Sequence, residues 1–300
     1  MRLDDFGNDL NVENQGRGGG FRFPGGGGFG LPLGRGGLGC GGIALLLVIS
    51  LVLGINPLSL LGGGGVPVVQ QPAGVSTGAG GSTNIQQICS EPDKNTSCRV
   101  LSSLNRTWSE ILPQYQAPGL SFYSRSGQSG CGAAQSAMGP FYCPADAKVY
   151  IDTSFYDEMA TRLGAPGDFV QGYIMAHEVG HHIQHLLGTA DQVRDAQQRA
   201  SRREANALSV RLELQADCYA GVWAARARNR DGSSVIEPGD IQEGLRAAQA
   251  IGDDALQRAS QGTVVPESFT HGTSAQRQFW LNRGLQTGDP RQCDTFNADA

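Results

Sequence analysis

The chain has 300 residues, 39% of them hydrophobic, and a formal net charge of -5 at pH 7. This length is sufficient for one substantial domain with appendages. The acidic balance and the lack of a basic, aromatic stripe argue against nucleic acid as a partner. The 44 glycines cluster on both sides of one apolar segment near the N-terminus, and this clustering divides the chain.

The apolar segment over 41–62 contains no charged residue and approaches the roughly 20 apolar residues that cross a bilayer. We expect a transmembrane helix there, preceded by a Gly-rich tail over 1–40 and followed by a flexible linker over 63–85. A buried core helix is the alternative, although the Gly-rich flanks offer no core against which to pack it. A cleaved signal peptide fits less well, because the region before the segment is long and contains acidic residues.

Basic residues predict the orientation of this span. Those nearest to it are Arg2, Arg17, Arg22 and Arg35 on its N-terminal side and Lys94 on its C-terminal side. The positive-inside rule therefore places the tail in the cytoplasm. We expect a single-pass protein of the inner (cytoplasmic) membrane, with the domain over 86–300 outside the cytoplasm.

The cysteines agree with an oxidising compartment. Two pairs are close enough in the sequence to close small loops: Cys89 with Cys98, and Cys131 with Cys143. Cys218 and Cys293 would tie the C-terminal tail to the domain, or they stay free as two buried thiols. The sequence does not decide between these alternatives.

The domain over 86–300 has an α+β pattern, mainly helical with a small sheet or hairpin. Residues 139–152 contain two short β-type runs separated by Pro-Ala-Asp, which predicts a hairpin or an edge strand. Periodic apolar patterns predict helices over 154–163, 169–187, 190–228, 238–250 and 274–283, the third of them interrupted.

The stretch HEVGHHIQH begins at His177 and contains an HExxH motif. His177 and His181 are i and i+4, so both imidazoles face the same side of a helix and can share one cation, with Glu178 beside them. His181 and His185 have the same spacing but no glutamate between them, so that pair would not activate water in the same way. A solvated helix with chance histidines is the simpler alternative.

A third ligand strengthens the metal hypothesis. A metzincin-type site would require Gly at 184 and His at 187, and Gln184 and Leu187 exclude that pattern. The later motif ELQAD supplies Glu213 instead, and Asp217 follows one turn further on the same face. Glu213 can complete a His-His-Glu set with water in the fourth position, while Asp217 can hydrogen-bond the far nitrogen of a ligating imidazole. An exposed acidic face is the alternative, but the neighbouring leucines and alanines make it a poor fit.

At this point the chain resembles the bacterial family of neutral zinc metallopeptidases. The motifs that carry the resemblance are MRLDDFGNDLNVENQGRG, AHEVGHHIQHLLG, ELQADCYAGVWA and FTHGTSAQRQFWLNRG. The resemblance implies a gluzincin-like fold, a zinc peptidase activity, zinc ligands at His177, His181 and Glu213, and Glu178 as the catalytic residue. The unusually Gly-rich N-terminal region departs from the family, and no particular substrate comes with the resemblance.

The expected reaction is hydrolysis of a peptide or protein substrate. Bound Zn²⁺ lowers the pKa of a water molecule, and Glu178 accepts its proton as general base. His271, Tyr219 and Arg277 are candidate donors to the oxyanion, and His271 is our choice. An extended substrate could pair with the edge near residues 139–142.

Two other functions fit the same motifs. The domain could be a zinc-stabilised, membrane-tethered scaffold or binding module, although a purely structural site does not need Glu178. It could also be a zinc amidase that acts on a cell-wall component. Residue patterns do not separate this activity from proteolysis.

Overall fold

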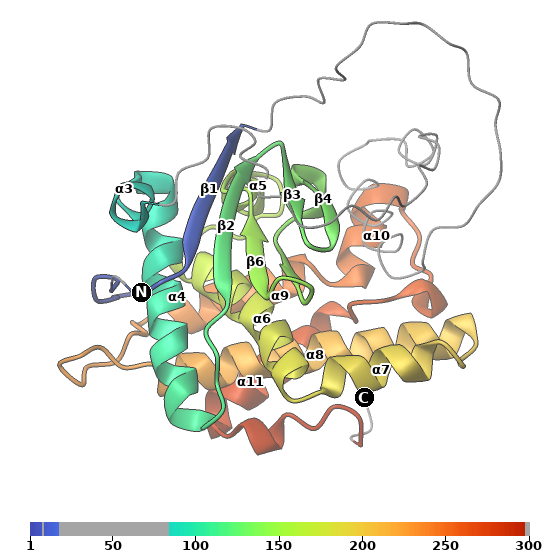
Figure 1. Cartoon of the computed structure of the whole chain (residues 1–300). Helices are drawn as coiled ribbons and strands as arrows, with labels where there is room; N and C mark the ends of the chain where they lie inside the picture. Colours follow the sequence, from blue (N-terminus) through green and yellow to red (C-terminus); the bar gives the residue numbers. More distant parts are fainter. Residues whose placement is uncertain (8, 18–83, 298–300) are drawn as a thin grey trace, which may run out of the picture.

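The structure is a computed structural model that describes residues 1–7, 9–17 and 84–297. Helices dominate these residues and one small sheet accompanies them, which confirms the α+β class (Figure 1). The strands are β1 (Val12–Arg17), β2 (Gly119–Ser124), β3 (Ser126–Ser129), β4 (Gly132–Gln135), β5 (Phe141–Cys143) and β6 (Lys148–Ile151). The helices are α3 (Ile85–Cys89), α4 (Pro92–Ile111), α5 (Ser154–Thr161), α6 (Asp168–Leu186), α7 (Thr189–Gln197), α8 (Arg202–Arg226), α9 (Asp240–Ala250), α10 (Asp253–Gln261) and α11 (Ser274–Thr287).

The sheet is mixed, with strand order β4-β3-β2-β6-β5 and with β1 paired to β2. Strand β2 runs parallel to β6, and Leu120 lies opposite Val149. Strand β5 runs antiparallel to β6, and Tyr142 lies opposite Val149. Strands β5 and β6 thus form the hairpin predicted over 139–152, and β5 lies at an edge of the sheet.

The N-terminal residues belong to this sheet. Strand β1 pairs in parallel with β2, with Val12 opposite Leu120. Leu10 and Val12 are buried in the hydrophobic core of the domain. Figure 1 shows β1 in blue beside β2, although about a hundred residues separate them in the sequence. The start of the predicted tail over 1–40 is therefore an integral part of the folded domain.

The predicted single-pass placement in the inner membrane is wrong. No helix in the described ranges is both long enough and apolar enough to span a bilayer. One crossing between β1 and β2 would also separate two strands that share a ladder. The predicted span over 41–62 itself lies outside the described residues, as does the linker over 63–85 apart from its last two residues.

The other sequence patterns correspond well to helices. The interruption predicted within 190–228 separates α7 from α8, and Ser201 begins α8 with a capping box that includes Glu204. Helix α4 was not predicted, although Leu101, Leu104 and Trp108 form a buried face at helical spacing. The two expected loop-closing pairs form disulfides, Cys89–Cys98 and Cys131–Cys143. Cys218 and Cys293, for which the sequence left two alternatives, also form a disulfide.

Close helix contacts place the residues of the HExxH motif against α8. At Gly180 on α6, a Cβ atom would lie only 3.0 Å from the Ala216 Cα atom of α8. At Gly284 on α11, a Cβ atom would lie 2.0 Å from the Cys218 carbonyl oxygen. Glycine at both positions lets the three helices approach closely. Figure 1 shows α6 between the sheet and α8, so one face of α6 meets α8 and another meets the sheet.

Candidate metal centre

Helices α6 and α8 bring three potential metal ligands together. His177 Nε2 lies 3.1 Å from Glu213 Oε2, and His181 Nε2 lies 3.5 Å from Glu213 Oε1. One ligand atom from each residue lies within 4.8 Å of the other two. Two imidazoles and a carboxylate at this spacing fit a zinc ion whose fourth position is open to water or substrate.

Asp217 lies directly behind His177. Its Oδ1 atom accepts a hydrogen bond from His177 Nδ1 at 2.9 Å and another from the Tyr173 hydroxyl at 2.6 Å. Without a metal, His177 Nε2 donates to Glu213 Oε2; with its proton kept on Nδ1 by Asp217, His177 would present the lone pair of Nε2 to a bound zinc ion. This is the geometry that the spacing of Asp217 and the HExxH motif predicts.

A buried ion pair keeps Asp217 charged. Arg277 donates to Asp217 Oδ2 through Nε at 2.8 Å and to Oδ1 through Nη2 at 3.0 Å. Burial alone would raise the pKa of the Asp217 carboxyl, but Arg277 and His177 together lower it to about 2. The sequence suggested Arg277 as an oxyanion donor, but its guanidinium is hydrogen-bonded to Asp217 instead. Through Asp217 it helps to hold the His177 imidazole in place.

Glu178 lies beside the ligands on the wall of the same cavity. Its side chain is buried, and burial raises the pKa of its carboxyl above the ordinary value, against the opposing effect of His177 and His181. A hydrogen bond from the Tyr142 backbone amide of β5 also lowers this pKa. A carboxylate with a raised pKa is suited to accept a proton from water near neutral pH.

His271 reaches the cavity from the segment before α11. Its Nδ1 atom lies 3.2 Å from Asp253 Oδ1, and Asp253 Oδ2 accepts the backbone N–H groups of Thr270, His271 and Gly272. Burial lowers the pKa of the His271 imidazole, but Glu213 and Asp253 outweigh burial and raise it. A protonated imidazole on the cavity wall can donate a hydrogen bond to developing negative charge.

The remaining histidines of the motif have other partners. His182 Nε2 donates to the Gln116 carbonyl at 2.6 Å, and its Nδ1 lies 2.9 Å from the Tyr142 hydroxyl. Burial lowers the pKa of His182, which favours a neutral ring that donates to Gln116 and accepts from the Tyr142 hydroxyl. His182 therefore fastens strand β5 to α6, whereas His185 lines the cavity without joining the ligand set.

The three candidate ligands line a cavity of about 410 Å³. Its walls beyond the polar centre are largely apolar: Phe155, Leu163, Ile174, Ile251 and Leu256. Residues 138–142, which lead into and include the start of the edge strand β5, also line the cavity. Tyr219 is not among the lining residues and packs edge-on against Trp108 instead, so it is badly placed to act as an oxyanion donor.

Sequence reasoning missed Asp253 and Gln184 as partners of His271 and His181. Asp253 begins helix α10, where an acidic residue is common for reasons of the helix dipole alone. Gln184 Oε1 lies 2.9 Å from His181 Nδ1. Its position i+3 from His181 was a usable signal, because residues at this spacing lie on the same side of a helix.

Comparison with known proteins agrees with a zinc peptidase class. A family model described as "Putative neutral zinc metallopeptidase" matches residues 1–296, so the chain belongs to this family. The uncharacterized protein YpfJ of Escherichia coli K12 is 50% identical over 291 residues, which cover 95% of each chain. The uncharacterized protein Rv2575 of Mycobacterium tuberculosis H37Rv is 40% identical over 262 residues, 83% of this chain and 85% of the relative. The search of solved structures found no significant match.

Proposed function

We propose that this protein is a zinc-dependent endopeptidase with a gluzincin-like active site. The observation that carries the proposal is the convergence of His177, His181 and Glu213 beside Glu178 in one open cavity. A bound zinc ion would polarise the substrate carbonyl and make water more acidic. A structural zinc site has four protein ligands and needs neither a base nor a cavity, so this arrangement supports an enzyme better than a scaffold.

Glu178 is the proposed general base. Its carboxylate accepts a proton from the attacking water and returns it to the nitrogen of the departing amine. The Tyr142 amide on β5 and the helix α6 together fix the position of this carboxylate. Because the carboxylate is already oriented toward the attacking water, less entropy is lost in reaching the reactive geometry.

His271 is the proposed donor to the oxyanion. Asp253 holds Nδ1 of its ring, which leaves Nε2–H free to donate into the cavity. Three backbone N–H groups donate hydrogen bonds to Asp253 Oδ2, so this carboxylate is held in position before substrate binds. A donor held in advance stabilises charge without reorganisation during the reaction.

Strand β5 is the proposed platform for the substrate backbone. It is at the edge of the sheet and lines the cavity through Phe141 and Tyr142. An extended peptide could add to this edge by backbone hydrogen bonds, which do not depend on sequence. The apolar part of the cavity would then receive a hydrophobic side chain of the substrate.

The direct test compares wild type with Glu178→Gln and with Glu110→Gln, an exposed glutamate on α4 that serves as the control. We expect one zinc per chain in all three proteins. Hydrolysis of an unfolded protein should fall by about 10²-fold or more in Glu178→Gln alone. Undiminished hydrolysis by Glu178→Gln would refute the mechanism, and a folded wild-type protein that binds no zinc would refute the site.

A further inference from the structure

His181, the second proposed zinc ligand, is held by an amide. His177 has the charged Asp217 behind it, whereas His181 Nδ1 lies 2.9 Å from Gln184 Oε1. Gln184 is completely buried, so its amide must find partners inside the protein. The partners of Gln184 therefore decide which atom it turns toward His181.

Two acceptors occupy the amide nitrogen of Gln184. It donates to the Leu212 carbonyl at 2.6 Å and to Gln215 Oε1 at 3.2 Å. A carbonyl cannot donate, so this orientation of the Gln184 amide is required. Its oxygen then faces His181 and accepts the Nδ1–H bond. The consequence is that His181 keeps its proton on Nδ1 and presents the lone pair of Nε2 to the metal position.

The hydrogen bonds that join His181 to Gln184 continue through Gln215 to the C-terminal tail, residues 288–297. We call this series of hydrogen bonds the relay. Its amide nitrogen donates to the Cys293 carbonyl at 3.0 Å, which leaves its oxygen to accept from Gln184. Cys293 is 1% exposed and forms a disulfide with Cys218, one turn beyond Gln215 on α8. The Cys293 carbonyl thus fixes the orientation of the Gln215 amide, as the Leu212 carbonyl fixes that of Gln184.

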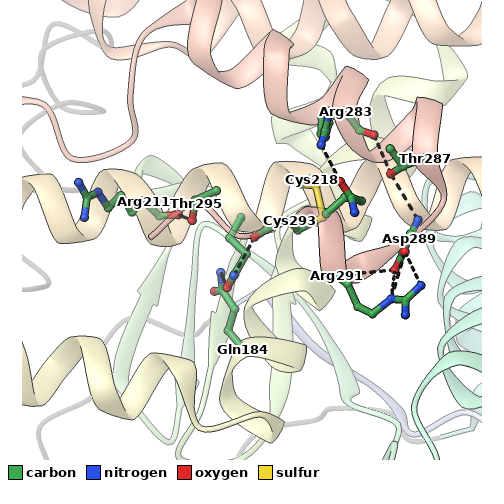
Figure 2. Close-up of a disulfide and its surroundings, with 11 residues drawn as sticks. Gln184, Arg211, Cys218, Arg283, Thr287, Asp289, Arg291, Cys293 and Thr295 are labelled. Carbon is green, nitrogen blue, oxygen red and sulfur yellow. Dashed lines mark hydrogen bonds and ion pairs between the residues drawn. A yellow bond between two sulfur atoms is a disulfide. The ribbon is translucent and has the colours of Figure 1, made fainter. Parts of the chain in front are cut away.

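The tail is attached to α8 at further points. Thr295 donates through its hydroxyl to the Arg211 carbonyl at 2.7 Å, and Arg211 Nη1 donates to the Phe296 carbonyl at 3.2 Å. In Figure 2 the disulfide is the yellow bond, and Arg211, Thr295 and Cys293 follow the same length of α8, with Gln184 close by. These contacts hold the Cys293 carbonyl in place independently of α6.

We propose that the C-terminal tail, anchored by the Cys218–Cys293 disulfide, positions the zinc ligand His181 through Gln215 and Gln184. The tail, which has no atom in the metal site, thereby contributes to zinc affinity. The inference rests on the zinc site of the proposed function but not on the reaction that the site performs.

The test measures the zinc dissociation constant by competition with a chromophoric chelator, together with the melting temperature of the zinc-free protein. Gln184→Leu removes the acceptor of the His181 proton and should weaken zinc binding about 10- to 100-fold. Gln184→Glu keeps an acceptor for that proton while it loses the donor to Leu212. It should therefore lower the melting temperature yet retain zinc affinity close to that of wild type.

Two variants act at a distance from His181. Gln215→Leu and the double variant Cys218→Ala/Cys293→Ala should each raise the zinc dissociation constant, and by less than Gln184→Leu, because Leu212 still holds the Gln184 amide. The matched control is Gln257→Leu, since Gln257 is a buried glutamine on α10 whose amide is fixed by Ser268 and Val265. This control should lower the melting temperature and leave zinc affinity unchanged.

The outcomes separate the relay from the zinc site itself. Zinc affinities for Gln215→Leu and the cysteine variant equal to that of Gln257→Leu would overturn the role of the tail while the proposed site stands. If Gln184→Leu does not fold, Gln215→Leu and the cysteine variant decide the question alone. A folded wild-type protein without zinc affinity would overturn the relay and the proposed function together.

Discussion

Asp217→Asn tests how strongly one buried charge supports the metal site. Asp217 is fully buried and accepts hydrogen bonds from Tyr173, His177 and Arg277. Arg277 and His177 lower its pKa from 3.8 to about 2 despite burial. This shift corresponds to roughly 2 kcal/mol of interaction with the charged form. The substitution removes that interaction and also leaves Arg277 buried without a counter-charge.

We expect two effects of Asp217→Asn near neutral pH. The free energy of unfolding of the zinc-free protein should fall by about 3 kcal/mol, because breaking a buried ion pair leaves an uncompensated charge. Zinc affinity should fall by roughly 10- to 100-fold, because His177 loses the carboxylate that orients it. Excess zinc should restore part of the hydrolysis, whereas excess zinc should not rescue Glu178→Gln.

The pH dependence of this effect has a definite sign. The folded-state pKa of Asp217 lies below its ordinary value, so the stabilisation is fully present above about pH 4 and is lost as the pH falls through about 2. This contribution of the Asp217 carboxyl should be constant from pH 6 to 8. Asp217 also raises the pKa of the His177 imidazole to about 10 against the effect of burial, and that part of the difference between wild type and Asp217→Asn should decrease as the pH rises from 6 to 8.

The assay is denaturant unfolding of the metal-free proteins, followed by zinc competition at a fixed pH. Asp191→Asn is the control, because Asp191 forms an exposed ion pair with Arg194 at 2.8 Å. Such a pair contributes about 0.2–1 kcal/mol. If Asp217→Asn loses no more stability and no more zinc affinity than Asp191→Asn, the reasoning about the buried ion pair is wrong.

Three further predictions follow from other parts of the structure. His271→Ala should reduce hydrolysis by about 10²- to 10³-fold while zinc stays bound, and loss of zinc in this variant would refute its role as oxyanion donor. Chelation of zinc should lower the melting temperature reversibly, by an amount that corresponds to about 2.7 kcal/mol when free zinc is 100 times its dissociation constant; an unchanged melting temperature would contradict the site. Acetylation of the Met1 amine should destabilise the domain at pH 7. Burial lowers the pKa of this amine, but hydrogen bonds to Asp168, Asp240 and Glu237 raise it to about 10, so its stabilisation is present below pH 8 and lost as the pH rises through about 10. Equal melting temperatures of the acetylated and free proteins at pH 7 would refute this interpretation.

Local spacing predicted most of the candidate metal centre. His177 and His181 are four residues apart on α6, so they lie on one face of the helix. Glu213 and Asp217 have the same spacing on α8. The sequence also indicated α6 and the β5–β6 hairpin, since their patterns depend on neighbouring residues. The sequence proposed Glu213 as the third ligand from its motif, but it did not show the packing that brings Glu213 to the two histidines, which is the close approach of α6 and α8 at Gly180.

The features that the sequence missed are non-local. Strand β1 pairs with β2 across a long sequence separation, and a polar segment of this kind carries no periodic signal of its partner. The Asp253–His271 contact and the bond from Gln215 to Cys293 likewise join residues from different elements. The error about localisation has the same origin, because an isolated apolar segment was interpreted without knowing that its two flanks share a sheet.

The two proposed imidazole ligands are oriented by groups of different charge, and this difference affects the metal centre. A carboxylate behind His177 would add negative charge next to the metal and reduce its ability to polarise a carbonyl, but the Arg277 guanidinium offsets that charge. The amide of Gln184 orients His181 with no net charge at all. Asp217 and Gln184 therefore both fix the ring nitrogens, and Glu213 is the only anion in the proposed ligand set. A zinc ion held by this proposed site would keep enough positive charge to polarise a carbonyl.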